Sequence, residues 1–200
     1  MFGKEIVQSL REGGVGVIPT DTLYGVVASV WRRDAIERVY ALRKRDIDKP
    51  CIILIADIPE LEKFSVSLSQ KEAVWLETVW PGKVSVMLPC TDEKLRYLTR
   101  GTGHLVFRIP DDTLLRAFLR ETGPLIAPSA NMQGEKPAET IAEARNHFGA
   151  AVDFYVDGGV LQSKPSTIVR LERDEVEVIR AGAVEIREDK KMTTEIGCQI

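Results

Sequence analysis

The amino-acid sequence predicts a single α/β domain. Short apolar runs that are typical of buried strands alternate along the chain with segments whose apolar residues recur at helical spacing. The length of 200 residues suits one domain, and the apolar content of 44% is enough for a packed core. No internal repeat or linker divides the chain. We therefore expect one domain over residues 1–186 and a polar tail over residues 187–200.

The expected strands are short apolar runs bounded by turn residues. They cover residues 15–18, 26–28, 51–55, 84–88, 105–109, 125–127, 152–157, 166–171 and 176–179, of which the last two form a hairpin. The expected helices begin at capping residues and carry apolar side chains on one face. They cover residues 2–12, 34–43, 59–64, 69–80, 112–122 and 140–148, with caps at Asp34, Ser69, Asp112 and Thr140.

Composition excludes several classes of protein. The formal net charge of -3 argues against a dedicated duplex-DNA binder, although it leaves room for a local basic groove. The three cysteines, Cys51, Cys90 and Cys198, are far apart and form no C-x-x-C, so neither a disulfide framework nor a zinc site is expected. A reducing, cytoplasmic setting fits this pattern. No apolar run approaches the ~20 residues of a membrane helix, and no signal-type segment is expected.

Two polar loops follow apolar strands that are far apart in the sequence. The stretch Ile18–Gly25 places Thr20, Asp21, Thr22 and Tyr24 directly after the first strand. A second strand is followed by Pro, Ser, Ala and Asn at residues 128–131. Ligands of open α/β sheets bind in the crevice beyond strand ends, so these loops predict a binding site. The alternative is a pair of polar turns capped by their own side chains.

Cationic side chains form a second set of candidates. The loop from Arg43 to Pro50 is the most charged of the chain, and its arginines and lysines suit phosphate. The alternative is an ordinary solvated loop, in which Asp46 and Asp48 offset the charge or approach a metal. Arg108 interrupts an apolar strand, which is costly unless the guanidinium is paired or the strand lies at an edge.

The chain has no recognisable covalent nucleophile. The Gly82-Lys83 pair is not a phosphate-binding P-loop, because Glu77 stands where the first glycine belongs and Val84 where Ser or Thr is needed. His104 and His147 are the two histidines, and neither belongs to a recognisable triad motif. Hydroxyls with several cations instead suit an anionic polar ligand, such as a nucleotide with an amino acid. Such chemistry depends on positioning and charge stabilisation, with Mg²⁺ as the accompanying ion.

Seven short blocks, in order from Gly13 to Gly182, resemble the threonylcarbamoyl-AMP synthases of the YrdC-like family. Each block is weak alone, but the set is specific. The blocks are P-T-[DE]-T-x-Y-G at Pro19–Gly25, a basic K-x-R-type loop at Arg43–Pro50, W-P-G at Trp80–Gly82, V-R-x-P at Phe107–Pro110 with Phe for Val, S-A-N-x-x-G at Ser129–Gly134, the pair Ser166-Thr167, and R-x-G at Arg180–Gly182.

The resemblance implies a twisted, mixed β-sheet flanked by helices around a deep concave site. It implies that ATP, L-threonine and bicarbonate are condensed to threonylcarbamoyl-AMP and pyrophosphate, with Mg²⁺ accompanying ATP and no metal ligands assigned to the protein. The product would feed the threonylcarbamoyladenosine modification of tRNA in the cytoplasm. Partners implied are a downstream threonylcarbamoyl-transferase complex and tRNA, the latter through double-stranded RNA binding.

The resemblance also assigns residues to the two substrates. Threonine would be bound by Thr22, Tyr24, Arg108 and Ser166. ATP and the adenylate would be faced by Arg43, Arg45, Lys49, Ser129, Asn131 and Arg180. Three positions depart from the family pattern. Arg43 replaces a lysine, Leu54 stands where many members have histidine, and His104 lies where threonine is common.

Two other functions remain open at this point. A non-catalytic RNA-binding module could use the same concave basic groove, although aromatic residues make up only 6% of the chain and do not cluster in the loops. Another carbamoyl- or adenylyl-transfer enzyme could share the fold, because fold alone does not fix function.

Overall fold

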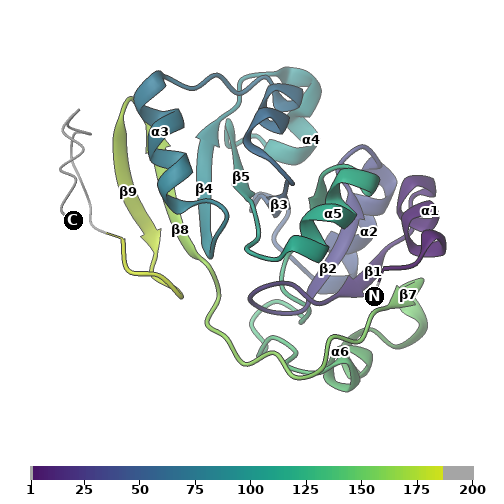
Figure 1. Cartoon of the computed structure of the whole chain (residues 1–200). Coiled ribbons are helices and arrows are strands. Elements are labelled where there is room, and N and C mark those ends of the chain that lie inside the picture. Colours follow the sequence, from purple (N-terminus) through teal and green to yellow (C-terminus); the bar gives the residue numbers. More distant parts are fainter. Residues whose placement is uncertain (1, 187–200) are drawn as a thin grey trace.

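The computed structural model describes residues 2–186 and shows a twisted mixed sheet with helices on both faces (Figure 1). Its strands run in the order β7-β1-β2-β6-β3-β5-β4-β8-β9. The pairs β1–β7, β3–β5 and β4–β8 are parallel and the other neighbours are antiparallel. The strands are β1 (Gly16–Ile18), β2 (Gly25–Ser29), β3 (Ile52–Leu54), β4 (Val84–Pro89), β5 (His104–Arg108), β6 (Leu125–Ile126), β7 (Phe154–Tyr155), β8 (Thr167–Glu172) and β9 (Glu175–Arg180).

Helices account for much of the rest of the described chain. They are α1 (Lys4–Glu12), α2 (Arg33–Arg43), α3 (Gln70–Val79), α4 (Arg96–Thr99), α5 (Thr113–Thr122) and α6 (Ile141–Phe148), with 3₁₀ turns η1 (Ile58–Phe64), η2 (Glu93–Leu95) and η3 (Gly149–Ala151). None of the helices within residues 2–186 is long and apolar enough to cross a membrane.

Alternation along the strands divides the apolar side chains between the two faces of the sheet. Val26 and Ile53 join the larger core cluster, which includes side chains of α2 and α3. Val27 and Leu54, the next residues along the same strands, join the smaller cluster with α1 and α5. The strand residues of the smaller cluster extend only as far as β3, in the middle of the sheet. The helices on this face therefore leave the rest of the sheet uncovered.

The caps at three helix starts are confirmed. Ser69 and Glu72 form a reciprocal capping box at α3, and Asp112 accepts the Leu115 N–H at α5. Thr140 caps α6 in the same way. The cap at Asp34 is wrong, because α2 begins earlier and Arg32 is its N-cap residue without a side-chain bond. Asp34 instead lies in the first turn, where the helix dipole favours a negative charge.

Other boundaries differ from the sequence prediction for local reasons. The segment 152–157 contributes only Phe154 and Tyr155 to the sheet, since the strand β1 beside it is itself short. The helical turns over residues 93–99 were not predicted. The expected tail over residues 187–200 lies outside the described residues.

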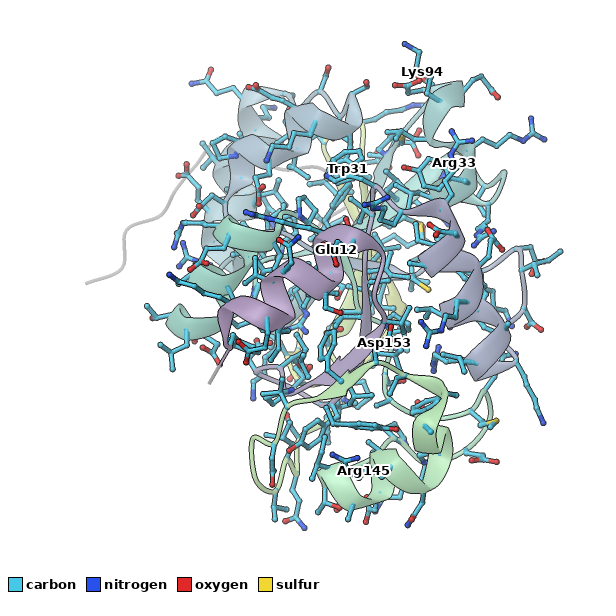
Figure 2. All side chains as sticks on the ribbon, turned by 90° about the vertical axis from the view of Figure 1, so that its right-hand side faces the viewer. Glu12, Trp31, Arg33, Lys94, Arg145 and Asp153 are labelled. Carbon is cyan, nitrogen blue, oxygen red and sulfur yellow. The ribbon has the colours of Figure 1, made fainter. Side chains whose placement is uncertain are left out.

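The face formed by α1, α2 and α6 carries charges of both signs (Figure 2). Glu12, Arg33, Lys94, Arg145 and Asp153 lie over this face. Several of its guanidinium groups are engaged within the chain, such as Arg38, which donates to Asp153 and to the Ala151 carbonyl. The face is therefore an ordinary solvated surface rather than a one-signed electrostatic patch.

The capping box of α3 generates a stability prediction. The Ser69 hydroxyl accepts the Glu72 N–H and also donates to Asp174 in the β8–β9 turn at 2.6 Å. Ser69→Ala should lower the free energy of unfolding by about 1 kcal/mol, the usual cost of losing a cap. The melting temperature should fall by about 2–4 °C, as expected for a domain of this size. Ser67→Ala is the control, because Ser67 is exposed and caps no helix. Equal effects of the two changes would contradict the assignment.

Candidate functional site

A cavity of about 250 Å³ occupies the uncovered part of the sheet. Its floor comes from alternate residues of three strands, Ile52 of β3, Val106 and Arg108 of β5 and Ile168 of β8. Loops far apart in sequence form its walls. The remaining lining residues are Thr20, Thr22, Leu23, Tyr24, Gly25, Arg43, Arg45, Pro50, Ala127, Pro128, Ser129, Pro137, Pro165, Ser166 and Arg180.

A register shift between β8 and β9, at the edge of the sheet, turns one of these lining residues toward the cavity. Val169 pairs with Val178, but the preceding Ile168 pairs with Arg180 rather than with Ile179. The irregularity places one extra residue in β9, which re-aims the following side chain. Arg180 therefore reaches the cavity, while Ile179 is left 40% exposed.

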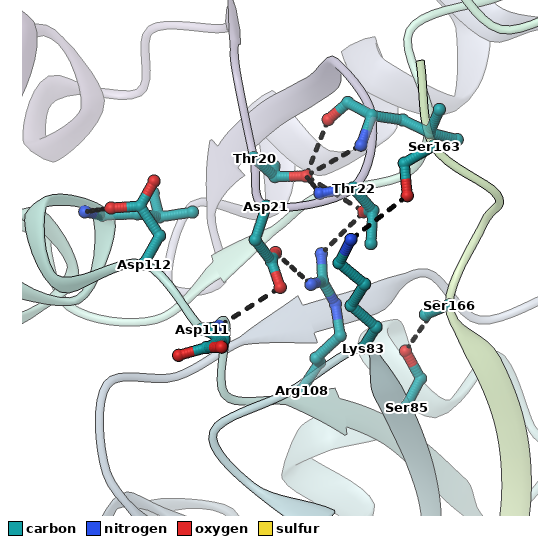
Figure 3. A network of polar contacts seen from close by, with 12 residues as sticks. Thr20, Asp21, Thr22, Lys83, Ser85, Arg108, Asp111, Asp112, Ser163 and Ser166 are labelled. Atoms are coloured by element: carbon teal, nitrogen blue, oxygen red, sulfur yellow. Dashed lines mark hydrogen bonds and ion pairs between the residues drawn. The ribbon is translucent and has the colours of Figure 1, made fainter. Parts of the chain in front are cut away.

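Arg108 is a buried charge in the middle of the sheet. β5 lies between β3 and β4, so the edge-strand alternative for Arg108 is wrong. Its guanidinium is ion-paired with the Asp21 carboxylate, and both side chains are 5% exposed. The Arg108 Nη2 also donates to the Thr22 hydroxyl at 3.3 Å (Figure 3). The pair satisfies the charge that an apolar strand could not otherwise tolerate.

The loop between β1 and β2 is ordered by its own hydroxyls. Thr20 Oγ1 accepts the N–H groups of Thr22 and Leu23 and donates to the Leu23 carbonyl at 2.7 Å. It also contacts Thr22 Oγ1 at 3.1 Å. The polar-turn alternative is thus correct for the local conformation, and the same turn presents Thr22 to the cavity. Local capping and ligand binding are compatible here.

Hydrogen bonds to other residues of the protein hold Tyr24 and Ser166 in position. The buried Tyr24 hydroxyl donates to the Gly159 carbonyl and accepts the Gly158 N–H at 2.9 Å, and its burial raises the pKa of the phenol. Ser166 Oγ lies 2.9 Å from Ser85 Oγ, and its carbonyl accepts from Arg180. Because these groups are already bonded to the protein, the site is preformed.

Arg43 fastens the end of α2 to the loop that follows β6. It is 3% exposed and donates through Nε to the Asn131 carbonyl at 3.0 Å. Its Nη2 donates to the side chains of Ser129 and Asn131. Its Nη1 has no hydrogen-bond partner among residues 2–186. Burial, followed by repulsion from Arg45, lowers the pKa of Arg43 to about 10.

Three arginines converge on this end of the cavity without an acidic partner in its lining. Arg45 is held by the carbonyls of Lys49 and Pro50 at 3.1 and 2.8 Å. The pKa of Arg180 is lowered by its burial and then by the positive charge of Arg45. The two guanidinium groups are therefore close enough to repel each other. Crowded cations in a concave, partly dry site favour an anion between them.

The cavity gathers the predicted site residues except Lys49 and Asn131. The Lys49 ammonium is exposed and ion-paired with Asp46. The Asn131 side chain is buried and donates to the carbonyls of Met132 and Glu135. Neither residue lines the cavity. Their roles in binding ATP stay predictions, as do the substrate contacts of the other residues.

Sequence reasoning did not assign Asp21 to the site, although it noted the residue as polar. Arg108 could have indicated the role of Asp21, because a guanidinium in an apolar strand is stable only with an acidic partner from another part of the chain. Residues 2–186 contain no group of three or more His, Cys, Asp or Glu side chains arranged to hold a metal ion.

The cavity of an α/β sheet thus combines hydroxyls with arginines that no acid in the lining neutralises, which suits small polar anions. Comparison with known proteins makes this more specific. The Sua5/YciO/YrdC family model, described as "Telomere recombination", matches residues 8–182. The chain belongs to this family.

Individual relatives carry informative names. The Bacillus subtilis (strain 168) threonylcarbamoyl-AMP synthase is 38% identical over 153 residues, which cover 75% of this chain and 44% of the relative. The Nitrosococcus oceani protein of the same name is 32% identical over 150 residues, covering 74% and 81%. The structure of P. abyssi Sua5 complexed with L-threonine matches with a TM-score of 0.83 and 25% identity, over 90% of this chain and 53% of that one. The chain thus spans about half the length of the first and the last, and the predicted fold class is confirmed.

The buried ion pair generates the prediction for this site. Asp21→Ala leaves the Arg108 guanidinium buried without its acid, which should cost about 3 kcal/mol of unfolding free energy. Urea unfolding of the purified variant measures this loss. Asp111→Ala is the matched control, because Asp111 is exposed and contributes only its N–H to Asp21. A loss below about 1 kcal/mol for Asp21→Ala would show that the pair does not hold the loop.

Proposed function

We propose that this protein is an L-threonylcarbamoyladenylate synthase, a nucleotidyltransferase that condenses L-threonine, bicarbonate and ATP. One observation carries the proposal. A single cavity joins an end with hydroxyls and a paired arginine to an end with three arginines that no acid neutralises within the lining. The first end suits an amino acid and the second a triphosphate. The names of the relatives point to the same reaction.

Threonine would bind at the end formed by Thr22, Tyr24, Arg108 and Ser166. The Nη1 of Arg108 is committed to Asp21, and its Nε has no partner among the described residues. The edge formed by Nε and Nη2 therefore carries an unused donor, the buried Nε, that a substrate carboxylate would have to reach. The Thr22 hydroxyl lies on that same edge. The L-threonine bound to P. abyssi Sua5 supports this choice of ligand.

ATP would place its phosphates against Arg43, Arg45 and Arg180, with Ser129 beside them. The unpartnered Nη1 of Arg43 offers one donor that the free protein does not use. The cavity lining has no carboxylate, so Mg²⁺ would arrive with ATP and be held by phosphate oxygens. When bound, Mg²⁺ would add positive charge beside the leaving pyrophosphate.

The reaction that this arrangement serves has two steps. The threonine amine attacks the carbon of bicarbonate, a C–N bond forms, and water leaves, so that the negative charge stays on the carbamate. A carbamate oxygen then attacks the α-phosphorus, and pyrophosphate leaves with the electron pair of the broken P–O bond. The chain contributes orientation and charge stabilisation, which are each worth several kcal/mol.

The wider setting is part of the same proposal. The adenylate would supply the threonylcarbamoyladenosine modification of tRNA in the cytoplasm, through a downstream threonylcarbamoyl-transferase complex. An RNA-binding module without catalysis is less well supported. The exposed Trp31, at 46%, lies just beyond the C-terminal end of β2, whereas Gly25 at its other end lines the cavity. No stacking platform therefore faces the cavity through Trp31.

The products of the reaction test the proposal directly. Purified protein with ATP, threonine, bicarbonate and Mg²⁺ should release pyrophosphate, and mass spectrometry should detect threonylcarbamoyl-AMP. Omission of any one component should abolish release, because the nucleophile is assembled from threonine and bicarbonate. ADP formation independent of threonine would indicate another transfer enzyme. ATP binding without turnover in the complete mixture would favour a binding module.

Arg45 provides a test of the phosphate end. Its side chain is anchored by backbone carbonyls rather than by core packing, so Arg45→Ala should fold normally. Loss of a charge-assisted contact worth roughly 1.5–3 kcal/mol should reduce the rate of adenylate formation at least about tenfold. Lys44→Asn removes a charge from the same loop outside the cavity, and Asn tolerates the left-handed backbone of Lys44. Near-normal activity of a folded Arg45→Ala protein would refute the assignment.

A further inference from the structure

Lys83 has no acidic partner within residues 2–186, and it lies next to the cavity without belonging to its lining. It directly precedes β4, and its carbonyl accepts the Thr167 N–H at 3.0 Å. Its ammonium donates a hydrogen bond to the Ser163 hydroxyl at 3.3 Å. The contacts proposed for threonine and ATP do not include this ammonium group.

The strand registers place Lys83 between two residues of the threonine end. On one side, Val84 pairs with Thr167, so the register continues to Lys83 beside Ser166. On the other side, Val86 pairs with Phe107, so Ser85 lies opposite Arg108. Lys83 is therefore diagonal to Arg108 across β4 and β5, at the spacing that long side chains span.

Alternation along β4 puts the Lys83 side chain on the cavity face. Val84 and Val86 belong to the core on the opposite face. Ser85 faces the cavity side, because its hydroxyl contacts that of Ser166. Lys83 is two residues from Ser85 and shares its face. Figure 3 shows the Lys83 side chain extending from β4 in the same direction as Arg108, toward the loops that carry Thr22 and Ser163.

Two anions must meet at this end if the proposed function holds. Threonine brings a carboxylate, for which the free edge of Arg108 is available, and bicarbonate brings a second negative charge. Asp21 already offsets the charge of Arg108. Arg43 and Arg45 lie at the phosphate end, and Arg180 reaches both ends, because it donates to the Ser166 carbonyl. Arg180 is committed to the Ser166 carbonyl, whereas Lys83 lies between Ser166 and Arg108 in the strand registers and has no acidic partner among the described residues.

We infer that Lys83 binds the bicarbonate and the carbamate made from it, an inference that rests on the proposed function. Its ammonium donates to a bicarbonate oxygen and retains its own protons throughout. The amine of threonine forms the C–N bond, water leaves, and the carbamate inherits the charge that Lys83 stabilises. A compact ammonium with three donors suits a small oxyanion that changes its substituents during the reaction.

The test measures KM values for each substrate in carbon-dioxide-free buffer with added bicarbonate. Lys83→Met keeps the length of the side chain and removes its charge. We expect its KM for bicarbonate to rise about tenfold, with the KM values for ATP and threonine changed less than about threefold. A charge-assisted hydrogen bond has this magnitude. Lys83→Arg should restore most of the affinity for bicarbonate.

Two matched variants separate this role from others. Lys164→Met removes a charge from an exposed residue next to Ser163 and should leave all three KM values unchanged. Ser163→Ala removes the hydrogen bond of Lys83 but keeps its charge, so the KM for bicarbonate should stay near that of the wild-type protein. A rise with Ser163→Ala equal to that of Lys83→Met would show that Lys83 only tethers the chain before β8.

The outcomes distinguish this inference from the proposed function. If the unchanged protein makes no adenylate, the proposed function fails. If the unchanged protein is active and Lys83→Met behaves like Lys164→Met, the inference alone fails. A Lys83→Met effect confined to the KM for ATP would likewise overturn it and would assign Lys83 to the phosphates.

Discussion

The buried charge of Arg108 is the constraint on which the site depends. A guanidinium in the central strand β5 is tolerated only with an acid beside it, and that acid comes from the loop between β1 and β2. The pair therefore joins β5 to a loop whose flanking strands are not direct neighbours of β5 in the sheet. It also fixes the position of Thr22, whose hydroxyl bonds to the same guanidinium. A stability requirement and a binding geometry are met by one interaction.

The opposite end of the cavity holds a buried cation at a cost in stability. Arg43 is buried near Arg45, and the fall of its pKa to about 10 corresponds to a penalty on the order of 3 kcal/mol for keeping the charge. Because the folded protein disfavours the protonated form, this penalty applies at every pH below about 10. A bound polyphosphate would offset this penalty, because its negative charge would stabilise the protonated Arg43. Relief of the penalty would then add to the binding free energy.

Arg43, which stands where the expected family pattern has lysine, has a structural role in this chain. Its planar fork donates to the Asn131 carbonyl and to the side chains of Ser129 and Asn131 at the same time. A lysine has one nitrogen and could not span these acceptors in this way. In this chain the residue therefore supports the loop after β6 as well as contributing charge. Asn131 is correspondingly turned away from the cavity, and its amide holds the loop through Met132 and Glu135.

The sequence alone determined the class of fold, the strands, most helix caps and the two loops that flank the site, because these depend on local periodicity and on turn and cap chemistry. The N-cap of α2 at Arg32 rather than Asp34 escaped it, since the chain turns directly after β2. Only the tertiary structure decided which acid neutralises Arg108, that a register shift turns Arg180 toward the cavity, and that Lys83 lies between Ser166 and Arg108. These depend on strand order and register, which join residues far apart in the chain and leave no periodic trace in the sequence.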